Sequence, residues 1–476
     1  MQPQLNLQIK KKHVRTISGV APLTVVVKPW TCPGKCTYCP EATDGTPKSY
    51  TEKSAPVIRA RECGWDAKKQ TEARLKIFNL MGHPTEKVEV LLLGGTFPAY
   101  PQNYQEEFVK GIFDGLNGFA SENLQQAKLS NETALHRCVG LCIETRPDWC
   151  DKKIIEKFLD YGCTRVELGV QALDEKINLR TQRGHGISEV AGATKILKDS
   201  AYKVFYHWMI GLPGSTPEKD LKMFKELWKN PSFRPDGLKI YPTLVIKGTK
   251  LEKEFLRGEF VPYTNEQIVE IVSKLKTLVP RYCRLARIMR AIPEEYIVGG
   301  SKNSHLRDEI KKYMRARGMV CQCLRCREAG FFSKAGGSLD FGNVKLNRID
   351  YKASGGKEIF LSIDEMKNDL MFALLRLRIP SAHNRGAGCE PEASTLPADT
   401  ALIREIHTFG QQIPIGTEGN IQHAGFGKML LAEAEKIARE EFDMKKILAI
   451  AGVGAREYFR KFGYVNDGAY VSKPLA

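Results

Sequence analysis

Short apolar runs alternate with amphipathic stretches through the first 290 residues of the chain. The apolar runs are rich in β-branched residues and predict buried strands at 22–27, 88–93, 139–143, 165–170, 204–210 and 237–241. Apolar residues three and four apart predict helices at 68–81, 152–161, 187–199 and 217–229. Strand and helix in turn indicate parallel βαβ units, so we expect an α/β fold, built as a complete or partial barrel, over residues 21–290.

The pattern changes after residue 290. Residues 291–337 contain one predicted helix, 306–317, and a tight cysteine cluster, and we expect them to form a linker. Residues 338–476 predict an α+β domain, with strands at 357–363, 370–379, 401–409 and 446–451 and a helix at 428–441. The segment 380–400 is rich in Ala, Gly, Ser and Pro, so we expect a mobile loop there, placed to cover a ligand pocket.

Composition narrows the class of protein. Hydrophobic residues make up 42% of the 476 and charged residues 27%, which excludes a disordered or collagen-like chain. A net charge of +17 favours a polyanionic partner such as nucleic acid. The chain has no apolar stretch of about 18 residues and its first residues are polar, so we expect a soluble, cytoplasmic protein with no membrane partner.

The basic N-terminal segment, 1–20, includes Lys10 to Lys12 and Arg15. Together with Arg59 and Arg61, it is expected to contact nucleic acid phosphates. A run of charge is also typical of a solvated surface, which is the alternative here.

Cys32, Cys36 and Cys39 form a Cys-x3-Cys-x2-Cys motif directly after the first predicted strand. Three thiolates on one loop can bind three corners of a [4Fe-4S] cluster and leave the fourth iron open. An open iron can chelate S-adenosylmethionine (SAM). The alternative is a zinc knuckle or three buried thiols.

This motif and its position resemble the radical SAM superfamily, whose core is a partial (β/α)6 barrel. The resemblance implies that the turn Gly94-Gly95-Thr96, after the second strand, presents its backbone to the amino group of SAM. A glycine pair after a strand is weak evidence by itself, because turns need glycine in any case. Together the two motifs indicate a radical SAM domain.

A second cluster, Cys321, Cys323 and Cys326, places three cysteines within six residues. Tetrahedral zinc is the usual occupant of such a set, and its role would be to stabilise the linker. The fourth ligand would be Cys283, His305 or Cys389, which the sequence does not rank. Ordinary unligated cysteines are the alternative.

The segment from Gln422 to Lys428, which includes Gly425 and Gly427, opens the predicted helix 428–441. Glycines there would let backbone amides surround a pyrophosphate at the helix N-terminus. The order of elements around it resembles the Gcn5-related acetyltransferases, which implies acetyl-CoA as ligand. The same resemblance places Tyr458 where a tyrosine can protonate a departing thiolate, although a core aromatic would look the same.

The union of the two domains resembles the family of the catalytic subunit of Elongator, which modifies the wobble uridine of tRNA. The resemblance extends over nearly the whole chain, in segments that include Arg15–Gly19, Glu144–Asp148, Phe233–Lys239, Tyr241–Ile246 and Gln422–Gly427. It implies cluster ligation by the first three cysteines and acetyl-CoA contacts at Lys87, Glu405, Ile406, His407, Thr408, Phe426, Gly427, Lys428, Tyr458 and Phe459. Many eukaryotic members have a second tyrosine where this chain has Phe459, so no hydroxyl can act at that position.

The resemblance implies a radical reaction on the tRNA anticodon stem-loop. A 5′-deoxyadenosyl radical would take a hydrogen from the acetyl methyl group, and the acetyl-derived radical would add to C5 of uridine 34. Loss of a hydrogen from the uridine adduct and hydrolysis of the thioester would then leave 5-carboxymethyluridine, with Tyr458 and Lys87 as the candidate catalytic side chains. The two domains would then have to face each other. The main alternative is a protein lysine acetyltransferase whose iron-sulfur domain is structural, and a tRNA-binding scaffold without catalysis is a third reading.

Overall fold

The computed structural model describes residues 16–43, 45–380 and 396–475. Most of the basic N-terminal segment, most of the predicted mobile loop and Cys389 lie outside the described residues. The roles predicted for them therefore stay predictions, as do the domain boundaries at residues 20, 290 and 337.

The first large sheet has seven parallel strands in the order β1-β2-β3-β4-β5-β6-β8. Their bounds are β1 Ala21–Val26, β2 Lys87–Leu93, β3 Arg137–Thr145, β4 Arg165–Gln171, β5 Lys203–Ile210, β6 Gly237–Pro242 and β8 Arg284–Ile288. The sheet is curled, and its edge strands β1 and β8 are not neighbours, so the barrel stays open on one side. This confirms the predicted partial barrel and adds a seventh strand, β8, that the apolar pattern did not predict.

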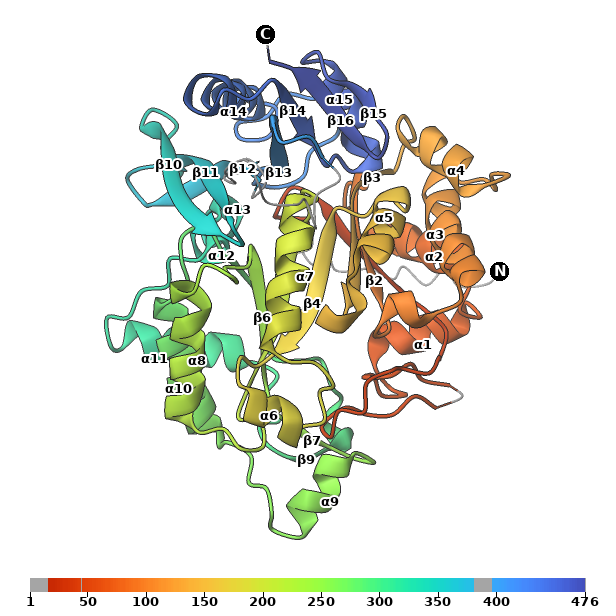
Figure 1. The fold of residues 1–476 in the computed structure, drawn as a ribbon, viewed down its shortest axis with the longest axis vertical. Helices are drawn as coiled ribbons and strands as arrows, with labels where there is room; N and C mark the ends of the chain where they lie inside the picture. Colours follow the sequence, from red (N-terminus) through yellow and green to blue (C-terminus); the bar gives the residue numbers. More distant parts are fainter. Residues whose placement is uncertain (1–15, 44, 381–395, 476) are drawn as a thin grey trace, which may run out of the picture.

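Helices cover the outer face of this sheet (Figure 1). The helices of this part of the chain are α1 Ala55–Glu62, α2 Ala67–Leu80, α3 Gln102–Asn117, α4 Leu124–Asn131, α5 Lys152–Asp160, α6 Glu175–Arg180, α7 Ile187–Asp199, α8 Pro217–Lys229, α9 Lys250–Leu256 and α10 Asn265–Thr277. Of these, α9 lies beyond the sheet and packs against β7. In β2, Val88, Val90 and Leu92 are buried against the helices, while the alternate residues, starting at Lys87, are half-buried. Side chains alternate along a strand, so Lys87 and Glu89 face the inside of the curled sheet.

The linker is compact rather than extended. It contains β9 Ile297–Gly299, which pairs with β7 Val245–Ile246, and the helices α11 Leu306–Arg315, α12 Leu324–Arg327 and α13 Ala329–Lys334. Among the described residues, every helix in the chain is too short or too polar to cross a membrane.

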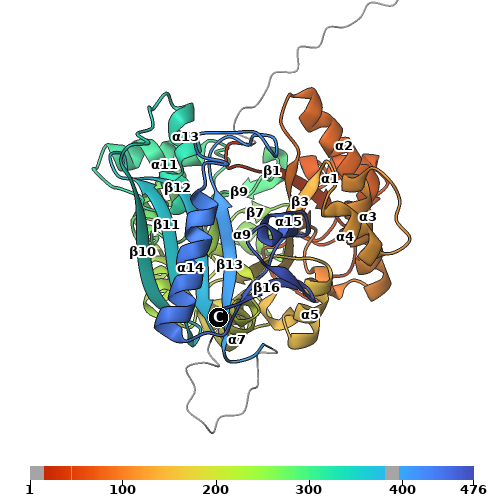
Figure 2. The same cartoon turned by 90° about the horizontal axis from the view of Figure 1, so that it is seen from above.

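The second large sheet is mixed and has the order β10-β11-β12-β13-β14-β16-β15. Its strands are β10 Val344–Ala353, β11 Gly356–Glu365, β12 Leu370–Ile379, β13 Thr400–Thr408, β14 Lys446–Ala449, β15 Val465–Asp467 and β16 Tyr470–Pro474. The helix α14 Phe426–Phe442 lies across β11, β12 and β13, as the view from above shows (Figure 2), and α15 Arg456–Arg460 follows β14. Only β13 and β14 pair in parallel, and the other neighbours are antiparallel.

The second sheet docks on the amino ends of the barrel strands, opposite the carboxyl ends that carry the first cysteine loop (Figure 1). A buried group of ion pairs forms the contact. Arg404 on β13 donates two hydrogen bonds to the carboxylate of Asp236, at 2.7 and 2.8 Å, and two to Glu358 on β11, at 2.7 and 3.1 Å. All three side chains are at most 1% exposed. Arg378 adds a hydrogen bond of 2.6 Å to Asp199, at the end of α7. The two sheets therefore form one rigid unit joined through charge.

We predict that Arg404→Leu lowers the free energy of unfolding by about 3–5 kcal/mol, because it leaves two carboxylates buried without their main cation. The matched control is Arg348→Leu, which removes a half-buried arginine that pairs with Asp350 and Glu441 at the surface. That control should cost about 1 kcal/mol or less. Urea unfolding followed by circular dichroism measures both, and equal losses in the two variants would contradict the prediction.

Candidate active site

The loop after β1 carries Cys32, Cys36 and Cys39 at the carboxyl end of the barrel. Cys36 is buried, and the other two are half-buried. The amide of Gly34 donates to Sγ of Cys32 at 3.4 Å, and the amide of Cys39 donates to the carbonyl of Cys36 at 3.2 Å. The three thiols therefore lie on one ordered loop.

Cations surround this loop and favour thiolate. Nη1 of Arg183 donates to Sγ of Cys36 at 3.2 Å. Burial alone would raise the pKa of Cys36, but the charge and hydrogen bond of Arg183, and the charge of Arg146, outweigh burial and lower it. The pKa of Cys39 is raised to about 12, because Cys39 is buried beside Cys36. One thiolate is thus stabilised in advance, and bound iron would supply the charge that ionises the others, so these residues fit a cluster.

The spacing of the three sulfur atoms also bears on the kind of metal. They do not gather within 4.8 Å of one another, as the second cysteine triplet does, among the residues that the structure describes. A cluster of several irons holds its thiolates further apart than a single ion does. The spacing therefore gives no support to a zinc knuckle here.

The glycine turn after β2 lies against the cysteine loop. Gly94 and Gly95 have φ angles of 133° and 101°, which favour glycine. A β-carbon at Gly94 would overlap the side chain of Val27. Oγ1 of Thr96 lies 3.7 Å from Sγ of Cys32. The structure thus brings the predicted SAM turn beside the predicted cluster ligands.

The inside of the barrel is charged. Glu144 on β3, Glu167 on β4 and His207 on β5 place their carboxylate oxygens and ring nitrogen within 4.8 Å of one another. Nε2 of His207 lies 2.7 Å from Oε2 of Glu167, and the ammonium of Lys239 on β6 pairs with Glu167 and lies 3.6 Å from Glu144. Barrel interiors are usually filled by branched apolar side chains, so charged residues there indicate a substrate site.

Glu167 and Lys239 hold each other in their ionised forms. Burial would raise the pKa of Glu167, but Lys239, His207 and Arg165 hold it well below its usual range. Burial would lower the pKa of Lys239, but Glu167 and its neighbours raise it. The ammonium of Lys239 already lies beside both carboxylates, so we assign no metal to this group. His207 and Glu144, each with 16% of the side chain exposed, face the accessible part of the lumen.

These lumen residues were not predicted from the sequence, because their strands have the pattern of apolar runs. The usable signal is a charged or polar residue at alternate positions of such a run: Glu167 in Arg-Val-Glu-Leu-Gly, His207 in Phe-Tyr-His-Trp and Lys239 in Leu-Lys-Ile-Tyr. In a parallel sheet whose outer face is covered by helices, such a residue has to face the inside.

In the second sheet, β13 and β14 diverge. They pair from Thr400 opposite Lys446 to Ile403 opposite Ala449, whereas β13 continues to Thr408. Within the described part of the chain, no β14 residue pairs with β13 beyond Ile403. The backbone of the predicted acetyl-CoA segment, 405–408, can therefore pair with an extended ligand such as a pantetheine arm.

The first turn of α14 lies beside this opening. The residue before the helix, Gly425, has φ 85°, and a β-carbon at Gly427 would collide with the hydroxyl of Tyr458 and lie 3.7 Å from Cδ1 of Ile406. Ile406, Gly427 and Tyr458 therefore meet where the helix amides favour a phosphate group. Burial raises the pKa of Tyr458 to about 12, so its hydroxyl keeps its proton and can donate it.

Lys87 reaches the glycine loop from the barrel. Its Nζ donates to Oε1 of Gln422 at 2.7 Å, and Nε2 of Gln422 donates to the carbonyls of Gly19 and Thr408 at 3.1 and 3.2 Å. Gln422 thus joins the segment before β1, the end of β13 and the barrel. The structure brings together Lys87 and Gln422, both of which we predict to contact acetyl-CoA.

Other members of the predicted acetyl-CoA set are used by the fold itself. Glu405 pairs with Lys203 at 2.8 Å, and Nε2 of His407 lies 2.7 Å from the carbonyl oxygen of Ser18. Phe459 is 2% exposed and lies in the core of the second sheet. For Glu405 and His407 the backbone, rather than the side chain, is what the structure leaves for a ligand.

The two predicted ligand regions lie at opposite ends of β2. Lys87 is its first residue and Gly94 follows its last, and at ~3.3 Å per residue the two ends are about 23 Å apart. Figure 1 shows the same arrangement, with the red loop after β1 at the bottom and the blue second sheet at the top. The charged lumen of the barrel lies between them.

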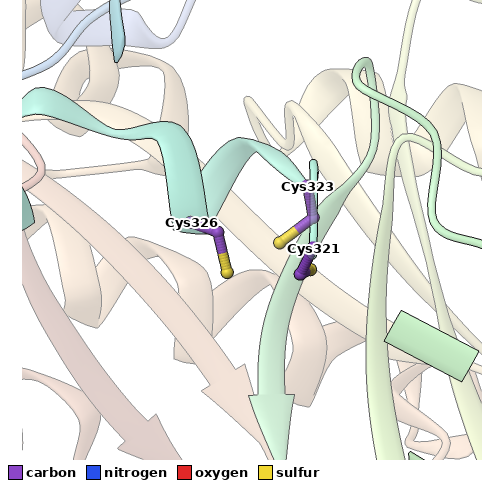
Figure 3. A group of neighbouring side chains, drawn as sticks. All are labelled: Cys321, Cys323 and Cys326. Carbon is purple, nitrogen blue, oxygen red and sulfur yellow. The ribbon is translucent and has the colours of Figure 1, made fainter. Parts of the chain in front are cut away.

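The second cysteine triplet gathers around one point. The sulfurs of Cys321, Cys323 and Cys326 lie within 4.8 Å of one another and point toward a common space at the start of α12 (Figure 3). Hydrogen bonds from Cys321 and Cys326 lower the pKa of Cys323 well below its usual value, although the site is buried. Such a set fits one zinc ion. Neither Cys283 nor His305 joins the group within 4.8 Å in the described structure.

Comparison with known proteins identifies the family. Residues 31–227 match the Radical SAM superfamily, and residues 235–316 match the Radical_SAM C-terminal domain. The chain is 48% identical over 467 residues to the tRNA uridine(34) acetyltransferase of Dehalococcoides mccartyi, covering 98% of this chain and 100% of the relative. It is 38% identical over 480 residues to Elongator complex protein 3 of Homo sapiens, covering 98% and 86%. The solved structure of the archaeal Methanocaldococcus infernus Elp3 with an N-terminal deletion has a TM-score of 0.85 at 44% identity, over 97% and 100%.

The chain belongs to the Elongator complex protein 3 family. Membership confirms the family resemblance read from the sequence, and the radical SAM match confirms the class of the first domain. A radical SAM domain of this family implies a [4Fe-4S] cluster and SAM, and the matched range includes Cys32, Cys36 and Cys39. It also includes the lumen residues Glu144 and His207, which our sequence analysis did not select.

We predict that the affinity for acetyl-CoA falls as the pH rises through about 8. Burial lowers the pKa of Lys87 to about 8, so its ammonium is present below that pH and lost above it. Lys87→Arg should keep its charge and give a flat profile, and Lys87→Met should bind roughly tenfold more weakly at pH 7. Isothermal titration calorimetry measures these affinities. The control is Lys274→Met, on the exposed side of α10, and a wild-type profile for Lys87→Met would contradict the prediction.

We predict about one zinc per chain in protein purified without chelators, held by the second cysteine triplet. Cys323→Ser should lose the zinc and lower the melting temperature, because metal binding stabilises the fold of such sites. Cys63→Ser, at the end of α1 and far along the sequence from the triplet, is the control and should keep it. Elemental analysis and thermal unfolding measure both effects. Equal zinc content in the two variants would contradict the assignment of zinc to this triplet.

Proposed function

We propose that this chain forms 5-carboxymethyluridine at position 34 of tRNA, with SAM and acetyl-CoA as co-substrates. The observation that carries the proposal is one charged lumen with a ligand region at each end: the cysteine loop at the carboxyl ends of the strands and the splayed β13–β14 edge at their amino ends. The names of the relatives support tRNA uridine 34 as the substrate, because the Dehalococcoides mccartyi protein is a tRNA uridine(34) acetyltransferase.

In this proposal Cys32, Cys36 and Cys39 hold the cluster. When bound, the cluster and SAM supply a radical able to take a hydrogen atom from a methyl group. The residues of this chain contribute by positioning the reacting groups. The Gly94-Gly95 turn allows close approach of backbone beside Cys32, and Arg183 donates to Sγ of Cys36 and favours its thiolate.

At the other end of the lumen, the free edge of β13 binds the pantetheine arm of acetyl-CoA. The first turn of α14 binds its pyrophosphate, and Lys87 adds a positive charge from the barrel side. The protonated hydroxyl of Tyr458 lies at the same turn and can donate to the thiolate when the thioester is hydrolysed.

The lumen residues position the base between the two ends. Lys239 and His207 can donate hydrogen bonds, and Glu144 and Glu167 can accept them, so the wall offers both kinds of partner to a uracil. The single-stranded anticodon loop is suited to deliver a base splayed out of its stack. Close positioning of reactants is the contribution that such a site makes to rate.

We predict that anaerobic reconstitution with iron, sulfide, SAM, a reductant, acetyl-CoA and a tRNA anticodon stem-loop gives 5-carboxymethyluridine, read by mass analysis of the nucleosides. With acetyl-CoA carrying a CD3 group, two deuterium atoms should appear in the product and one in 5′-deoxyadenosine. The variant with Cys32, Cys36 and Cys39 all changed to alanine should form neither, and Cys63→Ala is the matched control.

Acetyl-lysine on a peptide substrate, formed by the triple-alanine variant as well as by the native chain and without any modified uridine, would favour the protein acetyltransferase instead. Unlabelled 5′-deoxyadenosine together with product would contradict hydrogen abstraction from the acetyl methyl group.

A further inference from the structure

The open edge of the barrel is bordered by arginines. The edge strand β8 carries Arg284 and Arg287, and Arg287 lies opposite Lys239 on the neighbouring strand β6. Lys239 faces the lumen, where it pairs with Glu167, so its register partner Arg287 borders the same face. Arg287 is exposed. The lumen therefore reaches solvent beside this edge strand.

The linker brings two further guanidinium groups to the same strand. Nη2 of Arg307, on α11, donates to the carbonyl of Ala286 in β8 at 3.3 Å. The guanidinium of Arg325, on α12, lies 4.3 Å from the ring centroid of Phe331. The helix α12 is tied to β8 by a hydrogen bond of 3.0 Å between the amide of Leu324 and the carbonyl of Cys283. We call Arg284, Arg287, Arg307 and Arg325 the arginine rim.

The rim has more positive charge than the protein neutralises. Arg284 pairs with Glu328 at 2.9 Å. Arg287, Arg307 and Arg325 form no ion pair with a carboxylate in the described part of the chain. The charges of Arg307 and Arg284 repel that of Arg325, and the nearby carboxylate of Glu328, which is already paired with Arg284, attracts it. The cysteine triplet, if ionised, is near Arg307 and offsets part of this charge. Grouping half-buried cations costs free energy unless an anion joins them.

We infer that the arginine rim binds the phosphates of the anticodon loop and holds the RNA across the open edge of the barrel, an inference that rests on the proposed tRNA substrate. Guanidinium groups from a strand and two helices suit several phosphates of one chain better than a single anion. A base splayed from a strand held there has direct access to the lumen, between the two ligand regions. The rim thus explains why the barrel is left open on this side.

The experiment measures binding of a fluorescent anticodon stem-loop by anisotropy, over a series of salt concentrations, with the full chain. Arg287→Gln is the principal variant, because its side chain is exposed and its loss disturbs no ion pair. It should weaken binding about tenfold and reduce the slope of log K against log salt by about 1. Arg287→Gln with Arg325→Gln should reduce the slope by about 2, in protein whose circular dichroism and zinc content match the native chain. Arg439→Gln, on the exposed side of α14, is the charge-matched control and should change neither quantity.

An unchanged slope in both rim variants would overturn the inference. So would a loss of coenzyme A affinity, measured by calorimetry, without loss of RNA affinity, because the rim would then hold coenzyme A phosphates. The proposed function fails separately. If the native chain binds RNA through the rim but forms no carboxymethyluridine, the proposed function is wrong and the inference stands. If the chain forms the product but the rim variants leave the slope of log K against log salt unchanged, only the inference is overturned.

Discussion

The buried ion pairs of Arg404 with Asp236 and Glu358 set the geometry of the whole molecule. They join β13 and β11 of the second sheet to the amino end of β6 in the barrel. Because the arginine meets Asp236 through two parallel hydrogen bonds, the pair fixes angle as well as distance. A buried ion pair of this kind is weak evidence for stability but strong evidence for a defined relative orientation. The contact of Lys87 with Gln422 depends on that orientation.

This docking places the acetyltransferase-like edge at the end of the barrel opposite the cysteine loop. The two predicted ligand regions therefore face each other through the lumen rather than across a cleft. This arrangement gives the charged groups inside the lumen a role. Glu167 and Lys239 neutralise each other, but burying two charged groups costs free energy. A purely structural core would avoid that cost with apolar side chains. A polar substrate that passes between the two ends of the lumen accounts for the presence of these charged groups.

Much of this fold was predictable from sequence because its strands and helices have clear periods. The helices 187–199 and 217–229 have the bounds that their pattern predicts. The strand β8 was missed because its five residues, Arg-Leu-Ala-Arg-Ile, include two arginines three positions apart and so form neither a continuous apolar run nor a strict alternation. The cysteine motifs were local and readable, whereas the lumen group joins Glu144, Glu167, His207 and Lys239 from four strands. Their proximity follows from the curl of the sheet, which no local pattern encodes.

The net charge of +17 likewise shows how little a sequence says about spatial arrangement. Composition favours a polyanion but does not say where it binds, because many of the cations are consumed inside the protein. The docking contact alone uses Lys198, Lys203, Arg376, Arg378 and Arg404 against Asp199, Asp236, Glu358 and Glu405. These groups nearly neutralise one another and add little to the external field. Cations such as Arg287 and Arg325, which form no ion pair with a carboxylate in the described structure, are the ones whose field an approaching RNA meets.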